Sequence, residues 1–250
     1  QRCTVSDVCV VLCSYRGAAH LAEQLDSIAA QTRAPASVLV HDDASCDATL
    51  AIARAHPLGA TVRAHPDNVG VVANVERALR DALAEGRDYI ALADQDDVWH
   101  PERLARGRDR MRQLERRHGA GTPLLVHSDL AMVDAQRRPL APSFLAWRGY
   151  ARGERATLAT LLGQSGVMGN TCLCNRALLQ LALPFPPELH VHDWWLGVLA
   201  ELHGARACLE EPLVDYRIHA GNVSNALHRL DGGAGPGSWN RLLHRDFRLP

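Results

Sequence analysis

Three carboxylates lie within four positions, directly after an apolar run. Asp94, Asp96 and Asp97 follow residues 89–93, which have the pattern of a buried parallel strand. Like charges this close repel one another, so the cluster needs compensation. Hard oxygen ligands at a strand's carboxyl end favour Mg²⁺ or Mn²⁺ over zinc. We therefore expect a divalent cation here, with Asp96, at the centre of the cluster, as its main ligand.

Two earlier predicted strands also end in polar residues. Ser14 and Tyr15 follow residues 8–12, and Asp42 and Asp43 follow residues 37–40. Ligands of open α/β sheets bind at the carboxyl ends of the strands, which makes Asp43 the better ligand candidate of the second pair. Asp42 could instead hold its turn through a side-chain-to-backbone bond. Ser14 could be a cap, and Tyr15 could pack on the sheet edge.

A further carboxylate lies far downstream, at the start of a predicted helix. Asp193 precedes a segment that is apolar almost all round, which is typical of a buried helix beginning near His192. The helix dipole favours an ionised Asp193 there, and a plain N-cap role is compatible with catalysis. Trp194 and Trp195 suit stacking on a sugar face and core anchoring equally well.

Near the end of the chain, a predicted strand carries a cation and an imidazole. Strand alternation puts Arg217 and His219 on one face, with Tyr216 and Ile218 on the other. A cation plus an imidazole can meet phosphates or complete a metal shell. A lone histidine is as often structural.

The elements that must position these residues alternate regularly in the first half. We expect strands at residues 8–12, 37–40, 60–63, 89–93 and 124–126, and helices at 18–30, 47–55, 71–84 and from 101 onward. This alternation predicts a mostly parallel, doubly wound α/β sheet. In the second half we expect irregular chain at 132–152, a short strand at 169–175, and final strands at 206–209 and 213–218.

Composition excludes several classes of protein. The formal net charge of the 250 residues is −1, so no global field indicates a nucleic-acid partner. No apolar stretch reaches about 18 residues, so we expect no membrane span. The seven cysteines, without a CxxC pair, predict mostly buried free thiols in a reducing compartment. The chain starts at Gln1, from which we expect the native start to be missing.

An ordered set of motifs resembles the family 2 glycosyltransferases, which are inverting enzymes with a nucleotide-sugar-binding GT-A fold. The matching stretches are residues 10–15, 23–28 with 31–32, 42–47, 68–70, 94–99, 127–130, 169–171, 192–195 and 216–219. The combination DQDDVW and HDWW is most similar to the branch of rhamnosyltransferases of bacterial surface polysaccharide synthesis.

The resemblance implies a nucleotide site in the first half. Its expected residues are Ser14, Tyr15, Asp43, Asn68 and Asp94, with the first three at the base and Asp94 near the ribose. Three positions depart from the family pattern. Ala44 replaces a usual Gly, Arg16 a usual Asn, and Ala93 a common Ser. The first two remove no catalytic group, and the third removes one possible loop hydrogen bond.

The resemblance also implies the catalytic and acceptor residues. Asp96 would bind Mg²⁺ or Mn²⁺ on the diphosphate, His219 would approach the metal or diphosphate, and Asp193 would be the general base. The residues expected around the diphosphate and acceptor are Arg217, Gly169, Asn170, Thr171, Trp194 and Trp195.

These implications give one expected domain organisation and function. Residues 1–225 would form one GT-A catalytic domain, with a nucleotide-sugar half (1–130) and an acceptor half (131–225). Residues 226–250 would be a mobile, Gly-rich and truncated tail. The enzyme would transfer a sugar, best rhamnose from dTDP-rhamnose, or another dTDP- or UDP-sugar, to a surface glycan or lipid-linked acceptor. It would be cytoplasmic, associated peripherally with the inner face of the cytoplasmic membrane.

Three other classes of protein remain open. A nucleotidyltransferase also uses carboxylates and a metal, but its Gly-rich basic phosphate loop is reduced here to Arg16 and Gly17. A receiver-like signalling module is suggested by Asp42 and Asp43, but it would be about half this length. A non-catalytic sugar-binding domain would leave the base and metal candidates unexplained.

Overall fold

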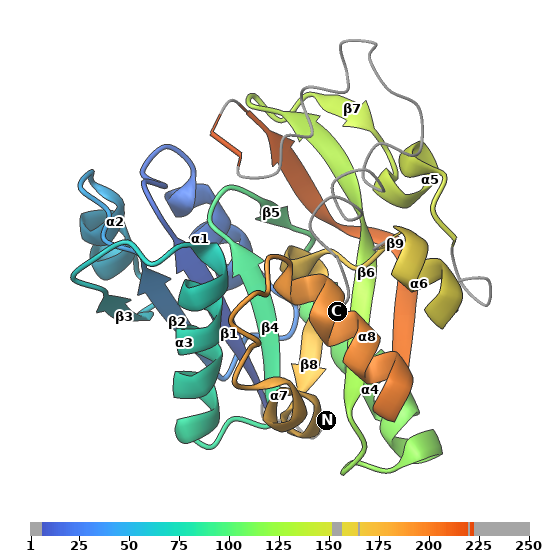
Figure 1. Ribbon diagram of the computed structural model, residues 1–250. Coiled ribbons are helices and arrows are strands. Elements are labelled where there is room, and N and C mark those ends of the chain that lie inside the picture. The colour runs from blue at the N-terminus through green and yellow to red at the C-terminus, as the bar shows by residue number, and fades with distance from the viewer. Residues whose placement is uncertain (1–6, 152–156, 165, 220, 223–250) are drawn as a thin grey trace.

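One mixed sheet of nine strands runs through the part of the chain that the computed structural model describes, residues 7–151, 157–164, 166–219 and 221–222. The strand order is β3-β2-β1-β4-β8-β6-β9-β5, with β7 paired to β6. The sheet is central and helices cover it on both faces (Figure 1). The predicted tail at 226–250 and Cys3 lie outside the described residues.

The first half is a parallel, doubly wound unit, as the alternating pattern predicts. Its strands are β1 (Val8–Ser14), β2 (Ser37–Asp42), β3 (Thr61–Ala64) and β4 (Tyr89–Asp94), and its helices are α1 (Leu21–Ala29), α2 (Thr49–Ala55) and α3 (Val71–Ala84). The register pairs Ser14 with Asp42 and Cys13 with Asp94. The polar strand ends therefore lie along one edge of the sheet.

The second half extends the same sheet with mixed strand directions. Its strands are β5 (Val98–Trp99), β6 (Leu124–Asp134), β7 (Pro139–Ala141), β8 (Leu173–Asn175) and β9 (Ala205–Ile218). Its helices are α4 (Arg103–His118), α5 (Phe144–Arg148), α6 (Leu158–Gln164), α7 (Arg176–Ala182) and α8 (His192–His203), with a 3₁₀ turn, η2, at Gly169–Thr171. β8 is antiparallel to both β4 and β6, and β6 is parallel to β9.

Alternating strand residues build two apolar cores. Val10 and Leu12 lie on the face covered by α1, α2, α4 and α5, whereas Cys9 and Val11 face α3, α6, α7 and α8. This alternation is what strand geometry requires of a sheet buried on both faces. Figure 1 shows α3 and α8 in front of the sheet, with α4 on its other side.

Three sequence predictions of secondary structure were wrong. β6 continues to Asp134 instead of ending at Val126, so part of the stretch expected to be irregular is strand. β9 is one strand in place of the two expected, and its register against β6 shifts twice, between Ser128 and Asp129 and between Asp129 and Ala131. The expected strand at 169–175 begins with the η2 turn, because the N–H groups of Thr171 and Cys172 bond back within the turn.

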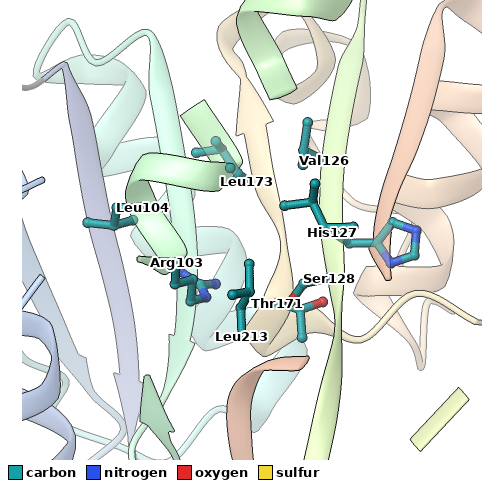
Figure 2. A pocket seen from close by; sticks show the side chains of 10 residues that line it. Arg103, Leu104, Val126, His127, Ser128, Thr171, Leu173 and Leu213 are labelled. Carbon is teal, nitrogen blue, oxygen red and sulfur yellow. The ribbon is translucent and has the colours of Figure 1, made fainter. Parts of the chain in front are cut away.

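A small cavity lies inside the second half of the fold. It measures about 10 Å³ and lies between α4 and the strands β6, β8 and β9; its labelled lining includes Arg103, His127 and Thr171 (Figure 2). A volume of this size admits at most one water molecule, so it is no substrate site.

Two further expectations concern cysteines and membrane spans. Six cysteines are free in the described part of the chain, and Cys9, Cys172 and Cys174 are buried, as predicted, while Cys46 is exposed. Within the described residues, no helix has the length and apolar character that crossing a bilayer requires.

Candidate active site

The end of β2 is a turn held by a buried carboxylate. Asp42 accepts a bond from the Ser45 backbone N–H at 2.8 Å, and from the hydroxyls of Ser45 at 2.7 Å and Ser14 at 2.8 Å. Asp42 is fully buried and Ser14 nearly so. The turn-holding role considered for Asp42 is therefore correct, and Ser14 contributes to the same turn.

Asp43 holds the loop that leads into α3. Its two carboxylate oxygens accept the backbone N–H groups of Val69 at 2.8 Å and Gly70 at 2.9 Å. The amide of Asn68 donates to the Asp43 carbonyl at 3.2 Å. The predicted nucleotide residues Asp43 and Asn68 are thus brought together, and each already has a bond that shapes the loop.

Two of the three departures from the family pattern share an unusual backbone conformation. Arg16 has φ +51° and Ala44 has φ +64°, in the left-handed region that favours Gly and Asn. The loops touch, because the Arg16 N–H donates to the Ser45 hydroxyl at 2.8 Å. Tyr15, the neighbour of Arg16, is 40% exposed, so its ring is available at the surface. The left-handed backbone at these two positions explains why the family pattern has Asn in place of Arg16 and Gly in place of Ala44.

Asp96 and His219, the two predicted metal ligands, are in direct contact. Oδ2 of Asp96 lies 2.9 Å from Nε2 of His219. Asn222 supports both residues: its Nδ2 lies 3.4 Å from the same Asp96 oxygen, and its Oδ1 accepts the His219 N–H at 2.6 Å. The rings of His20 and His219 are 4.9 Å apart between centroids. Asp96 and His219 thus present two possible donor atoms at one point.

The donor set fits a metal that shares its shell with phosphate. Across the described residues, no group of three or more His, Cys, Asp or Glu side chains is arranged to hold an ion. Mg²⁺ in phosphate-transferring sites is commonly held by one or two carboxylates, with waters and substrate phosphates completing the shell. A carboxylate and an imidazole at Asp96 and His219 suit such a site better than an all-protein cage.

The carboxylates at this edge act on one another. The pKa of Asp94 is raised to about 7, first because surrounding protein atoms desolvate it and then because Asp96 and Asp193 are negatively charged. Because Asp94 is exposed to solvent, we attribute its raised pKa mainly to repulsion by the charges of Asp96 and Asp193. Burial, followed by the charges of Asp96 and Asp94, raises the pKa of Asp97 well above its usual range. Such mutual repulsion favours binding of a cation.

The guanidinium of Arg217 is buried and bonded to other groups of the protein. Its Nε donates to the Asp96 carbonyl at 2.9 Å and its Nη1 to the Ala135 carbonyl at 2.9 Å, while its Nη2 contacts Glu23. The side chain is only 3% exposed. These contacts do not support the predicted role of Arg217 at the diphosphate. Through its bond to the Asp96 carbonyl, Arg217 stabilises the loop that carries Asp96.

Asp193 lies in the first turn of α8, where the sequence predicts it. Its Oδ2 accepts the Gly169 N–H at 2.9 Å, which joins α8 to η2. A Cβ at Gly169 would lie 3.0 Å from Nε2 of His192 and 3.6 Å from Asp193, so a larger residue would fit only if the His192 side chain moved by a few tenths of an ångström. Burial lowers the pKa of His192. The backbone of Gly169 therefore orients the predicted base.

Four of the residues expected near the acceptor have structural roles. Asn170 and Thr171 are buried: the Asn170 amide donates to Asp97, and the Thr171 hydroxyl donates to the Met168 carbonyl at 2.7 Å. The indole N–H groups of Trp194 and Trp195 donate to backbone carbonyls, and both rings pack on the core. These contacts favour anchoring of η2 and α8 over acceptor binding.

Several residues of the site have no role in the sequence predictions. Arg103 is buried, stacks 3.5 Å from the Trp99 ring centroid, and donates to the Leu92 carbonyl at 2.9 Å and the Asn170 carbonyl at 2.7 Å. Burial lowers its pKa to about 9. Gln95 and Glu23 belong to the motifs quoted above, and this membership could have indicated that they lie at the site. No pattern in the sequence identifies Arg103 or His20.

The fold and the edge of carboxylates define a GT-A type of α/β protein, and comparison with known proteins gives the family to which it is similar. Residues 9–127 match the family model described as Glycosyl transferase family 2. This match spans most of the nucleotide half of the chain, which is similar there to the glycosyltransferases of this family.

Two curated relatives illustrate the match. Uncharacterized protein Rv1520 of Mycobacterium tuberculosis is 30% identical over 224 residues, covering 86% of this chain and 59% of the relative. The dTDP-rhamnosyl transferase RfbG of Shigella flexneri is 29% identical over 103 residues, covering 37% of this chain and 34% of that protein. The chain thus spans about three fifths of the length of the first of these relatives.

Solved structures show the same fold. TarS of Staphylococcus aureus in complex with UDP-GlcNAc has a TM-score of 0.65 at 20% identity, over 88% of this chain and 61% of that one. The mannosyltransferase PcManGT of Pyrobaculum calidifontis, in complex with GDP-Man and Mn²⁺, has a TM-score of 0.63 at 18% identity, over 95% and 68% of the two chains. At these identities the likeness establishes the fold alone.

Proposed function

We propose that this chain is a metal-dependent, inverting glycosyltransferase that moves a sugar from a nucleoside-diphosphate donor to a hydroxyl. One observation carries the proposal. Asp96 contacts His219 at 2.9 Å, its neighbour Asp97 accepts the Asn170 amide, and Asp193 accepts the N–H of the adjacent Gly169 at 2.9 Å, so both carboxylates are tied to the η2 turn. A metal ligand and a possible base at one edge match the needs of the reaction, which must stabilise a leaving diphosphate and activate an alcohol.

The nucleoside is held by the ends of β1, β2 and β4. Each Asp43 oxygen accepts one backbone N–H and retains a second acceptor site for a base N–H. The Ser14 hydroxyl donates to Asp42 and keeps its own acceptor capacity. The exposed ring of Tyr15 offers a stacking face, Asn68 shapes the loop beside it, and Asp94 lies toward the ribose.

The diphosphate is bound where Asp96 meets His219. These two side chains would hold Mg²⁺ or Mn²⁺, and the ion would supply positive charge beside the departing phosphate oxygen. Arg217 fixes the Asp96 backbone and Asn222 fixes His219, so both ligands are oriented before the donor arrives.

Asp193 accepts the proton of the acceptor hydroxyl. The Gly169 N–H holds one of its carboxylate oxygens, which sets the direction of the side chain. The hydroxyl attacks the anomeric carbon on the face opposite the leaving diphosphate, so a single displacement inverts that centre. Residues 1–225 serve as one catalytic domain for this reaction.

The name of the Shigella relative bears on the substrate. RfbG is named a dTDP-rhamnosyl transferase, which makes dTDP-rhamnose the first donor to test, ahead of UDP-sugars. A bacterial surface glycan or a lipid-linked precursor is the proposed acceptor. A lipid-linked acceptor would bring the enzyme to the inner face of the cytoplasmic membrane as a peripheral protein.

A panel of nucleotide sugars tests the function. Purified protein with Mn²⁺ should release free nucleoside diphosphate from at least one donor, first dTDP-rhamnose, and EDTA should stop the release. Asp96→Ala should abolish it, whereas Asp88→Ala, a control at the opposite end of β4, should not. Release of pyrophosphate instead would indicate a nucleotidyltransferase. The absence of any turnover or nucleotide binding across the panel would refute an enzymatic role.

A further inference from the structure

The pairing of β1 with β4 continues past the end of the backbone ladder. The last paired residues of the two strands are Cys13 and Asp94. One position beyond Asp94, the side-chain amide of Gln95 pairs with the backbone of Tyr15. Oε1 of Gln95 accepts the Tyr15 N–H at 2.8 Å, and Nε2 of Gln95 donates to the Tyr15 carbonyl at 2.9 Å. The amide satisfies both backbone groups of Tyr15, as a neighbouring strand would.

Gly17 leaves the space that this contact needs. A Cβ at Gly17 would lie 2.1 Å from Oε1 and 2.5 Å from Cδ of Gln95. The Gly17 backbone does not adopt a left-handed conformation, so the requirement for glycine is one of space. An alanine here would therefore displace the end of the Gln95 side chain.

We propose that Gln95 is a positioning residue that joins the base-holding part of the nucleotide site to the metal-holding part. Gln95 follows Asp94 and precedes Asp96, and its amide grips the backbone of Tyr15, so the Tyr15 ring and the Asp96 carboxylate move as one body. A nucleoside diphosphate must contact both at once. Fixing their separation raises the effective concentration of the second contact. This inference rests on the proposed function.

Binding measurements separate positioning from simple support of the fold. Gln95→Ala should bind dTDP or UDP with Mn²⁺ about tenfold more weakly than the wild type by calorimetry, since two hydrogen bonds that order the loop are lost. Pyrophosphate with Mn²⁺ contacts only the metal-holding part, so its affinity should stay the same. Gln95→Glu, which lacks the Nε2 donor, should weaken nucleoside diphosphate binding in the same selective way.

A double-mutant cycle gives the sharpest test. Gly17→Ala should weaken nucleoside diphosphate binding about as much as Gln95→Ala, because the added methyl displaces the amide. In the Gln95→Ala background the same change should have no further effect, because the clashing atoms are gone. Gly121→Ala, at a position with open space around its Cβ, is the matched control and should bind like the wild type.

Three results would overturn the inference: wild-type dTDP and UDP affinity in Gln95→Ala, an equal loss for pyrophosphate, or additive effects in the cycle. A wild-type protein that binds pyrophosphate with Mn²⁺ but no nucleoside diphosphate would refute the inference and the proposed function together. Selective loss in the variants alone, with turnover intact in the wild type, would support both.

Discussion

Replacing Asp193 by Asn removes the proposed base while keeping its shape. Loss of a general base commonly slows a reaction by about 10²–10⁴-fold. At about 1.36 kcal/mol for each tenfold step, this corresponds to a barrier higher by about 3–5 kcal/mol. Sugar transfer should therefore fall by at least about 100-fold in Asp193→Asn, with little change in the binding of the donor.

The structure indicates that this variant will fold. The Asp193 carboxylate accepts the N–H groups of Gly169 at 2.9 Å and Trp194 at 2.7 Å. An amide can accept only one of them through its oxygen, so one N–H is left without its acceptor, at a cost of about 1 kcal/mol or somewhat more. A domain that is stable by about 5–15 kcal/mol tolerates such a loss. Removing a negative charge also reduces repulsion of the diphosphate.

The assay compares turnover with binding. Release of nucleoside diphosphate in the presence of acceptor gives kcat, and calorimetry with dTDP or UDP plus Mn²⁺ gives the affinity. Asp88→Asn, at an exposed position just before β4, is the matched control and should keep wild-type values for both. If Asp193→Asn keeps turnover within about threefold of the wild type, Asp193 is not the base.

Three more predictions follow from particular residues. Ala44→Gly should raise the melting temperature by about 2–4 °C, because Ala44 has φ +64°, whereas Ala48→Gly, at φ −74°, should lower it; an unchanged or lower value for Ala44→Gly would contradict the strain. Burial lowers the pKa of His41 to about 4, below its unfolded value near 6.5, so stability is full above about pH 6.5 and falls by up to about 3 kcal/mol as the pH drops through 4. Urea unfolding between pH 7 and 4 should show a flatter loss in His41→Gln, and an identical slope would exclude His41 as a cause. Removing Mn²⁺ with EDTA should weaken dTDP or UDP binding in the wild type but not in Asp96→Ala; calorimetry that shows equal affinities with and without metal in the wild type would contradict metal-assisted binding.

The parallel half of the fold was predictable because the apolar pattern of each segment agrees with the element that the segment forms. Apolar runs such as Val8–Ser14 and Tyr89–Asp94 are buried on both faces; a helix follows the first directly and the second after the short strand β5. Their polar ends had to meet at one edge of the sheet. Asp96 was therefore recognisable from its own segment.

The second half was harder because tertiary contacts bury polar residues there. His127 and Asp129 interrupt the apolar pattern of β6, which made the strand look shorter than it is. In the structure the imidazole of His127 pairs with Arg206 at 2.8 Å, and Asp129 accepts the Leu145 N–H at 3.1 Å. Such partners come from distant segments and leave no local signal in the sequence.

The site shows the same division between local and long-range information. Residue types and motifs selected Asp96, His219 and Asp193 as candidates, but they do not show which side chains face a ligand. Arg217 illustrates the difference, since its guanidinium is taken up by the Asp96 and Ala135 carbonyls and by Glu23. Only the packed structure assigns it to the protein interior.

A co-crystal with dTDP or UDP and Mn²⁺ is the most direct test of the central claim, that one edge of this sheet brings a metal-bound diphosphate and a carboxylate base together. The anomalous signal of the ion should lie within ligand distance of Asp96 and His219 and bridge to the diphosphate, with the Asp193 carboxylate facing the open side of the sugar position. An ion bound away from Asp96, or a diphosphate that leaves Asp193 outside the site, would contradict the claim.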